Sequence, residues 1–536
     1  MSAEETVVIA GGGPIGMALS IDLALRGIPS VVLEQRASEA TFPPRTNQTT
    51  ARSMEHFRRW GIAQALRDND AMDQEYTRDF RWITRLNGYV VANFPGGVEW
   101  APRFDWASEI PEWAPNPSIE KTLRERVDEL GVDIRFSCIV KGFEADDDHV
   151  TVSYTDINGD EQSVSGAFLV GADGSRSVVR NQLGVRMEGH ADLAIASVWY
   201  IHAPAIKELA RDKVGLSAFY WFCNEDRTGQ LLIVQDAEGH YLLFDAPIPE
   251  GVDPNDWERE KAQLIENVGE EIEVTVQGGG EVRIHSLMAP RFDHGRVILA
   301  GDAAHLISPF GGFGMNIGIE DVANLGWKLA AMLQGWGGDK LISSYSTERR
   351  EAETWLLDEC AQNVGALAPH FAQDGMEADD EAGEALRKEI GETIVSRKSR
   401  EYISMGGQFG YQYSESPVVA RNGASAPIST LHEYKPSSVP GCRAPHVWVD
   451  DDTSLFDLFG PYFTLLKLDA SIDTSALEVA AVERGVPLTV IAPQHPKLDE
   501  LYQTKLALIR PDEHVAWRSD ATPDDPGAII DLARGV

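Results

Sequence analysis

Three segments of this chain combine glycine-rich backbone with a carboxylate, the residue types that proteins use to hold phosphate groups and sugar-like hydroxyl groups. They are residues 11–16 with Glu34, residues 171–174 with Asp173, and residues 301–302 with the glycines of residues 311–314. Glycine lets a ligand approach the main chain because no Cβ intervenes. A carboxylate accepts hydrogen bonds from hydroxyl groups. We therefore expect the three segments to hold one extended ligand.

The first segment lies between two expected strands. Residues 7–10 (VVIA) form an apolar run that predicts a strand buried on both faces, and residues 15–26 predict a helix. Between them, residues 11–16 match GxGxxG, whose glycines allow a tight turn, close approach of a pyrophosphate and close helix packing. Residues 30–34 predict the second strand. This order predicts a bound dinucleotide, and both FAD and NAD are compatible with it.

The second and third segments repeat the arrangement. Residues 168–171 and 297–300 are apolar runs that predict buried strands, and an aspartate follows each of them. In an open α/β sheet, ligands bind beyond the carboxyl ends of the strands, so the three loops should converge. A helix is expected to begin at Met315, directly after the last glycines. Its N-terminus would place a partial positive charge against the ligand.

The motifs GxGxxG, GADGSRS and GDAAH resemble those of the class A flavoprotein monooxygenases, the family of the FAD-dependent aromatic hydroxylases. Other segments resemble the phenol hydroxylase and hydroxybiphenyl monooxygenase branch, and the resemblance covers nearly the whole chain. It implies that the cofactor is FAD and that NADPH or NADH is a transient cosubstrate. In the family, the aspartate that matches Asp302 binds the ribityl chain of FAD. The glycine run after it passes along the isoalloxazine ring.

The predicted cofactor contacts follow from the loop chemistry and the resemblance together. Arg36 and Arg45 match basic positions near the FAD phosphates, where they would offset the acidic charge of the chain. Asn116 stands where relatives usually have glutamine, and His305 is interpreted as a packed turn histidine. The predicted cofactor-binding residues are Gly11, Gly13, Pro14, Ile15, Gly16, Glu34, Gln35, Arg36, Arg45, Thr46, Asn116, Asp173, Gly301, Asp302, Pro309, Gly312, Gly314, Met315 and Asn316.

Alternating aromatic and β-branched runs between residues 193 and 248 predict antiparallel strands of a separate sheet, which in the family lines the substrate pocket. The predicted catalytic residues are Asn47, Tyr220, Trp221 and Pro309, and the resemblance implies that Trp221 stacks on substrate. Some relatives carry a histidine as phenol base at the place of Asn47. An amide orients a hydroxyl group but does not take its proton at neutral pH. Another residue, water or prior ionisation of the substrate must then supply this step.

We expect an α/β fold: a Rossmann-like (GR2-type) FAD-binding domain, an interleaved antiparallel-sheet substrate domain and a C-terminal thioredoxin-like domain. The expected ranges are 1–75, 106–185 and 286–370 for the first, 76–105 and 186–285 for the second, 371–417 for a helical linker, and 418–536 for the third. The last range has the order strand, helix, strand, hairpin, helix. Because no cysteine follows Cys442, dithiol chemistry is excluded there and a structural or dimerisation role is expected.

The composition limits the kinds of binding partner that we expect. A net charge of −37 over 536 residues disfavours nucleic acid and anionic membrane surfaces. No apolar stretch is long enough to span a membrane, and no signal peptide is recognisable. Four scattered cysteines predict neither a disulfide framework nor a metal site. We expect a cytoplasmic homodimer whose ligands are FAD, NAD(P)H, O2 and a small aromatic substrate.

Together these observations predict an FAD-dependent monooxygenase that hydroxylates a phenolic substrate ortho or para to its hydroxyl group. As the resemblance implies, NAD(P)H reduces the flavin, and O2 then gives a C4a-hydroperoxide whose distal oxygen enters the ring. Two alternatives remain open. One is a flavin dehydrogenase, oxidase or binding protein that inserts no oxygen, and the other is a tailoring monooxygenase that acts on a polycyclic aromatic natural product.

Overall fold

The computed structural model describes residues 5–40, 47–69, 71–72, 75–97, 103–364, 371–421 and 423–536. Its first sheet has the order β17-β18-β11-β1-β2-β7. These strands are β1 (Val7–Ala10), β2 (Ser30–Leu33), β7 (Asp133–Arg135), β11 (Phe168–Gly171), β17 (Asp293–His294) and β18 (Val297–Leu299). Only β17 and β18 pair antiparallel among them. Because β1, β11 and β18 are adjacent and parallel, their carboxyl ends share one edge of the sheet, as the sequence predicts.

Helices cover this sheet, which explains why its strands are continuously apolar. The helices are α1 (Pro14–Leu25), α2 (Ala51–Arg59), α3 (Ala63–Asp68), α4 (Asn116–Glu129), α5 (Val178–Gln182), α8 (Gly314–Leu333) and α9 (Lys340–Val364). All four residues of β1 are completely buried. Two small sheets complete this part: β8 (Ile139–Ala145), β9 (Val150–Thr155) and β10 (Glu161–Gly166) form one, and β3 (Gln48–Thr49) and β6 (Glu112–Trp113) the other.

An eight-stranded sheet forms the second part, in the order β19-β16-β12-β15-β14-β13-β4-β5. Its strands are β4 (Thr77–Ile83), β5 (Val90–Phe94), β12 (Glu188–His202), β13 (Ser217–Cys223), β14 (Thr228–Val234), β15 (His240–Asp245), β16 (Thr275–Met288) and β19 (His305–Leu306). Helices α6 (Ala205–Asp212), α7 (Trp257–Val268) and α10 (Glu381–Tyr402) accompany it. The expectation of a wholly antiparallel sheet is wrong in one place. Strand β13 pairs parallel with β4 because the chain reaches β4 about 140 residues earlier, from the FAD-binding part.

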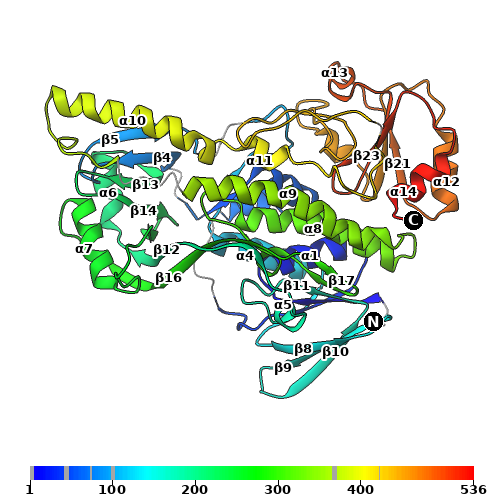
Figure 1. Cartoon of the computed structure of the whole chain (residues 1–536), viewed down its shortest axis with the longest axis horizontal. Coiled ribbons are helices and arrows are strands. Elements are labelled where there is room, and N and C mark those ends of the chain that lie inside the picture. The colour runs from blue at the N-terminus through cyan, green and yellow to red at the C-terminus, as the bar shows by residue number, and fades with distance from the viewer. Residues whose placement is uncertain are drawn as a thin grey trace.

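The C-terminal part has the predicted order strand, helix, strand, hairpin, helix, with one additional short helix at Leu498–Tyr502 before the hairpin. Its sheet, β21-β20-β22-β23, contains β20 (Phe463–Lys467), β21 (Leu488–Ile491), β22 (Leu506–Ile509) and β23 (Val515–Ser519). Its helices are α12 (Ser475–Glu483), α13 (Leu498–Tyr502) and α14 (Pro526–Ala533), and the short helix α11 (Met405–Phe409) precedes it in the range expected as a linker. Figure 1 shows this part and the eight-stranded sheet at opposite ends of the molecule, with the long helices α8 and α9 between them.

Buried ion pairs join the C-terminal part to the FAD-binding part. Arg510 contacts both carboxylate oxygens of Glu348 on α9 at 2.6 and 2.8 Å, and Lys328 of α8 contacts the same carboxylate at 2.6 Å. Arg443 and Glu55 form a second pair. Because removal of one partner from a buried ion pair is strongly destabilising, these contacts make the C-terminal part integral to the fold.

The structure also bears on the expectations about the cysteines and about membrane-spanning helices. The four cysteines are buried and form no disulfide. Within the described ranges, no helix combines the length and the apolar character that crossing a membrane requires.

Candidate active site

Gly11 and Gly16 of the GxGxxG loop are packed so closely that a Cβ on either would overlap the main chain. Gly11 has a φ of +102°, and a Cβ on it would lie 2.3 Å from the main-chain oxygen of Ala172. A Cβ on Gly16 would lie 1.9 Å from the oxygen of Gly11. Gly13 is the N-cap residue of α1, and no side-chain hydrogen bond caps the helix there. Pro14 is the first residue of the helix. The first N–H groups of α1 therefore remain for an anionic ligand at the edge of the sheet.

Glu34 lies where the second strand ends and is fixed by the same loop. Its Oε2 accepts a hydrogen bond from Gly12 N at 2.7 Å, and its Oε1 accepts from the main chain and the Nε of Arg36 at 2.8 and 2.9 Å. Arg36 also lies 3.7 Å from Glu120 of α4. Burial raises the pKa of Glu120 to about 7. Gln35 is exposed, and Asn116 is buried at the first residue of α4.

The second glycine-rich loop is linked to the third by a hydrogen bond. Asp173 Oδ2 accepts hydrogen bonds from two N–H groups at the start of α5, at 2.7 and 3.2 Å. Its Oδ1 is buried and has no hydrogen-bond partner among the described residues. Arg180 of α5 donates to Ala303 O at 3.1 Å, which links the two loops. Burial lowers the pKa of Arg180, and the carboxylates of Asp173 and Asp302 oppose that shift.

Asp321 of α8 fixes the third loop. Its Oδ2 accepts hydrogen bonds from Gly301 N at 2.9 Å and His305 Nε2 at 2.8 Å, and its Oδ1 accepts one from Arg349 at 2.9 Å. Burial by itself lowers the pKa of His305, but the carboxylates of Glu353 and Asp321 outweigh it and raise the value to about 9. His305 is therefore a charged member of a buried ion cluster, in agreement with its interpretation as a packed residue.

The glycine run between β19 and α8 lies against β3. Gly311 and Gly312 have φ values of +132° and +71°, and a Cβ on Gly312 would lie 3.1 Å from the side chain of Gln48. Asn316 accepts from Thr50 N at 2.9 Å and donates to Gly312 O at 2.7 Å and to Gln48 O at 3.1 Å. The side chain of Asn316 is thus used to hold the loop, and only its main chain remains for the predicted cofactor contact.

The residues around the shared strand edge fit FAD. Asp302 is exposed, although both of its chain neighbours, Gly301 and Ala303, are buried. The unpartnered Oδ1 of Asp173 and the uncapped start of α1 add an acceptor and a set of donors at the same edge. Pro309 is exposed and Gly314 and Met315 are half-buried, so this part of the loop is open as well. Arg45 and Thr46 lie outside the described residues.

One face of the eight-stranded sheet lies opposite the glycine run. Register pairs place Tyr200, Ile233, Leu242 and Phe244 on this face. The ring of Phe244 meets that of Phe310 in the glycine run, with centroids 5.9 Å apart and planes at 84°. These apolar side chains form a wall suited to an aromatic ring.

Trp221 and Tyr220 are both buried, and as neighbours on β13 they lie on opposite faces of the sheet. Trp221 is 1% exposed, stacks on Trp82 at 4.8 Å, and has Lys398 of α10 over its ring at 5.3 Å. The register places Trp221 on the same face of the sheet as Leu231 and Phe244, and its predicted stacking on substrate stays a prediction. Tyr220 is fully buried, and its hydroxyl group donates to Gly215 O and accepts from Ser217 N. Its hydrogen bonds serve its own segment.

Asn47 does lie beside the sheet. Its main-chain oxygen accepts a hydrogen bond from Ala114 N at 2.9 Å. Its side-chain oxygen accepts one from Gln235 Nε2 at 2.6 Å. Gln235 directly follows β14, and its main-chain N donates to His240 O at 2.9 Å. Asn47 therefore stands at the end of the sheet face where the hairpin between β14 and β15 turns.

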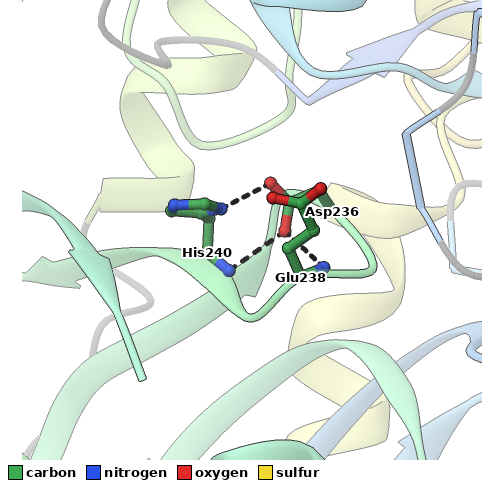
Figure 2. A group of neighbouring side chains, drawn as sticks. All are labelled: Asp236, Glu238 and His240. Atoms are coloured by element: carbon green, nitrogen blue, oxygen red, sulfur yellow. Dashed lines mark hydrogen bonds and ion pairs between the residues drawn. The ribbon is translucent and has the colours of Figure 1, made fainter. Parts of the chain in front are cut away.

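That hairpin gathers three titratable side chains, Asp236, Glu238 and His240 (Figure 2). Asp236 Oδ1 accepts from the main chain of the other two at 2.9 and 3.1 Å, and its Oδ2 lies 2.6 Å from His240 Nδ1. The His240 ring stacks on Tyr200 at 5.5 Å. These contacts stabilise the turn and give the sheet face a polar end beyond its apolar wall.

The sequence interpretation missed Gln48, Gln235 and Asp321. Gln48 and Gln235 carry no local signal, because their partners lie far along the chain. Asp321 had a local signal, because it follows Glu320 between the apolar residues Ile319 and Val322 of α8, and a buried charge there needs a partner.

The chain is similar in sequence and in structure to known proteins. A family model described as an FAD binding domain matches residues 4–359, and one described as the C-terminal domain of aromatic-ring hydroxylases matches residues 437–534. The chain is 28% identical to 4-methyl-5-nitrocatechol 5-monooxygenase of Burkholderia sp, covering 99% of this chain and 97% of the relative. It superposes on RebC with bound 7-carboxy-K252c with a TM-score of 0.89, at 32% identity and 99% coverage of both chains. The ternary complex of aklavinone-11 hydroxylase with FAD and aklavinone gives a TM-score of 0.83, at 26% identity, covering 100% of this chain and 99% of that one.

Proposed function

This chain belongs to the family of the class A FAD-dependent aromatic hydroxylases, and on that premise we propose that it hydroxylates a phenolic aromatic compound ortho or para to its hydroxyl group. NADPH or NADH is the proposed reductant, O2 the source of the oxygen atom, and a homodimer the working state. The observation that carries the proposal is the apolar face of Tyr200, Leu242 and Phe244 opposite a glycine run at the edge of the FAD-binding sheet.

FAD is the cofactor of this fold, and several groups of the chain are placed to hold it. The open N–H groups at the start of α1 suit the pyrophosphate, Glu34 a ribose, and the exposed Asp302 the ribityl chain. The glycine run that contains Gly311 and Gly312 leaves main-chain groups for a flat ring. When bound and reduced, FAD activates O2 so that one oxygen atom can enter an aromatic ring.

The chain's own residues supply orientation and a dry site. Leu242, Phe244 and Phe310 exclude water, so that the activated oxygen is not lost as hydrogen peroxide. Asn47 orients the phenolic oxygen from the polar end of the face, so that the ring carbon ortho or para to it points at the glycine run. No side chain of the protein takes part in electron transfer in this proposal.

The test is a screen of NAD(P)H oxidation over mono-, di- and polycyclic phenols, with products analysed after reaction under 18O2. We expect strong stimulation by a subset of phenols and one labelled oxygen atom in the product. Turnover that continues without O2 in the presence of a dye acceptor, with no labelled product, would support a flavin dehydrogenase instead. Binding of FAD without NAD(P)H oxidation under any condition would support a binding protein.

A polycyclic substrate is the favoured form of this proposal because of the length of the sheet face. Phe244 and His240 are four residues apart on one strand, which corresponds to about 13 Å at the usual strand rise. A molecule of several fused rings fills such a length, whereas a single ring does not. Preference for monocyclic over polycyclic phenols in the screen would contradict this point.

A further inference from the structure

A small cavity lies beside the glycine run, among residues of helices α2, α8, α9 and α11. The space open to the centre of a water molecule is about 20 Å³, and one water needs about 10–15 Å³ of such space, so one or two fit. Phe313, Ile317 and Leu356 form the apolar part of the wall, and every lining residue except Tyr411 is buried. None of the lining residues belongs to the eight-stranded sheet, so this inner cavity is distinct from the proposed substrate face.

Hydrogen-bond donors and acceptors share the wall of the inner cavity. Gln408 turns its side-chain oxygen to Ala51 N at 3.0 Å, and its Nε2 is buried with no hydrogen bond to a described residue. The same holds for both carboxyl oxygens of Glu353, and for Arg52 Nε and Glu320 Oε1. Buried polar atoms in native proteins are paired with protein groups or with ordered water. A water molecule both donates and accepts, so it can satisfy both kinds of atom in this cavity.

Glu353 also belongs to the ion cluster that fixes the third loop. Its Oε1 lies 3.3 Å from Arg349 and 3.6 Å from His305. Burial raises the pKa of Glu353 well above its ordinary value, and the carboxylate of Asp321 adds to this shift, whereas the charges of His305 and Arg349 oppose it. Glu353 therefore keeps its proton near neutral pH, and Asp321 is the anion that accepts the hydrogen bond from Gly301 N. The proton of Glu353 lies directly behind the loop that is proposed to hold FAD.

An outer cavity lies on the other side of Tyr411. Its wall includes the exposed residues Pro427 and Lys435, so it reaches the surface. The space open to the centre of a water molecule is about 10 Å³, close to what a single molecule needs. Tyr411 lines both cavities, and its hydroxyl group donates a hydrogen bond to Glu320 in the wall of the inner one. Tyr411 is therefore the polar group through which the two cavities can communicate.

We propose that the inner cavity is a permanent binding site for water, and that Glu353 exchanges its proton with solvent through this water and the hydroxyl group of Tyr411. Each exchange is neutral: the O–H bond of Glu353 breaks as its proton passes to the cavity water, and a new O–H bond forms with a proton that entered from the outer cavity. The proposal goes beyond the proposed function, because none of these groups is asked to touch an aromatic substrate.

The other charged groups around the route are held in pairs. Arg52 contacts Glu55 at 2.9 Å and also pairs with Glu513. Arg349 and His305 both donate to Asp321. The rival explanation for proton exchange at Glu353 is transient opening of the local structure, which does not need the hydroxyl group of Tyr411.

The experiment follows the proton of Glu353 by infrared spectroscopy. The FAD-loaded, oxidised protein is transferred from H2O to D2O at neutral pH, and the C=O stretching band of the protonated carboxyl group is recorded as it shifts on deuteration. Glu353→Gln identifies the band by removing it, and glutamine is neutral like the protonated acid that it replaces. In Tyr411→Phe the half-time of the shift should lengthen at least about tenfold, because exchange then has to wait for local opening.

Two further variants separate the explanations. Tyr413→Phe removes a hydroxyl group from a buried ring that lines neither cavity, and it should keep the half-time of the wild type. Ala352→Leu places a larger side chain in the wall of the inner cavity and should slow the exchange as well. This second variant keeps the test valid if Tyr411→Phe does not fold.

A crystal structure of the FAD-loaded protein tests the water site directly. We expect a water molecule within hydrogen-bonding distance of Glu353 and Gln408. Four results would overturn the proposal: a dry inner cavity, no acid band lost in Glu353→Gln, an unchanged half-time in folded Tyr411→Phe or Ala352→Leu, or equal slowing in Tyr413→Phe. Failure of the proposed function is distinguishable, because a protein that hydroxylates no phenol would still show the same infrared exchange.

Discussion

Replacement of Asp321 by asparagine should destabilise the FAD-binding part of the protein and weaken its hold on FAD. The carboxylate is completely buried and accepts hydrogen bonds from Gly301 N, His305 and Arg349. Two of these donors are cations, so the substitution leaves buried positive charge without its partner. It also loosens Gly301, which leads directly into the exposed Asp302.

The magnitude can be worked out from these contacts. Removing one partner of a buried ion pair costs about 3–5 kcal/mol. Asparagine keeps one acceptor oxygen, so the lower end, about 3 kcal/mol, is expected near neutral pH, or roughly a hundredfold in the folding equilibrium.

The loss should depend on pH with a definite sign. His305 has a folded pKa of about 9 against an ordinary value of 6.5, so its stabilisation is full below about pH 6.5 and is lost as pH rises through about 9. The difference between wild type and variant should therefore shrink towards about pH 10.

Urea unfolding of the apoprotein, followed by tryptophan fluorescence at about pH 6 and about pH 10, measures the difference in free energy of unfolding. FAD titration of the folded proteins measures the effect on the loop. Asp128→Asn, on the exposed surface of α4, is the matched control and should change neither. A loss below about 1 kcal/mol, or one that is equal at both pH values, would refute the reasoning about this ion cluster.

Three other predictions concern FAD directly. Asp302→Ala removes an exposed carboxylate at the strand edge. FAD binding should weaken at least tenfold, since a hydrogen bond to a charged group contributes about 1.5–3 kcal/mol. A fluorescence titration measures the affinity, and full retention of FAD would contradict the assigned role. Gly11→Ala places a Cβ 2.3 Å from Ala172 O at a φ of +102°. The affinity for FAD and the unfolding temperature should therefore both fall. An unchanged affinity would mean that the loop does not hold the cofactor. Glu120 gains its charge as pH rises through about 7 and then competes with phosphate for Arg36. Wild-type affinity for FAD, measured by equilibrium titration, should therefore fall from about pH 6 to about pH 8, whereas Glu120→Gln should show a flat profile; parallel profiles would count against this competition.

Short-range patterns predicted much of the fold. The apolar run of residues 7–10 became β1, and the GxGxxG glycines after it became a loop that no Cβ fits. The order of elements after residue 461 was also predicted from local runs and turns. In each case the determining interactions lie within a few residues, because strand burial and turn conformation are properties of neighbouring side chains and dihedral angles.

The sequence by itself therefore determined the cofactor loops and the type of fold, whereas the tertiary structure decided what packs against each side chain of the candidate site. Trp221, for example, has over its ring Lys398 of α10, a helix that begins 160 residues later. The side-chain oxygen of Asn47 has a hydrogen-bond donor only because Gln235, 188 residues away, meets it beside two main-chain carbonyl groups. A side chain's orientation depends on what packs against it, and those contacts come from segments that no local pattern connects.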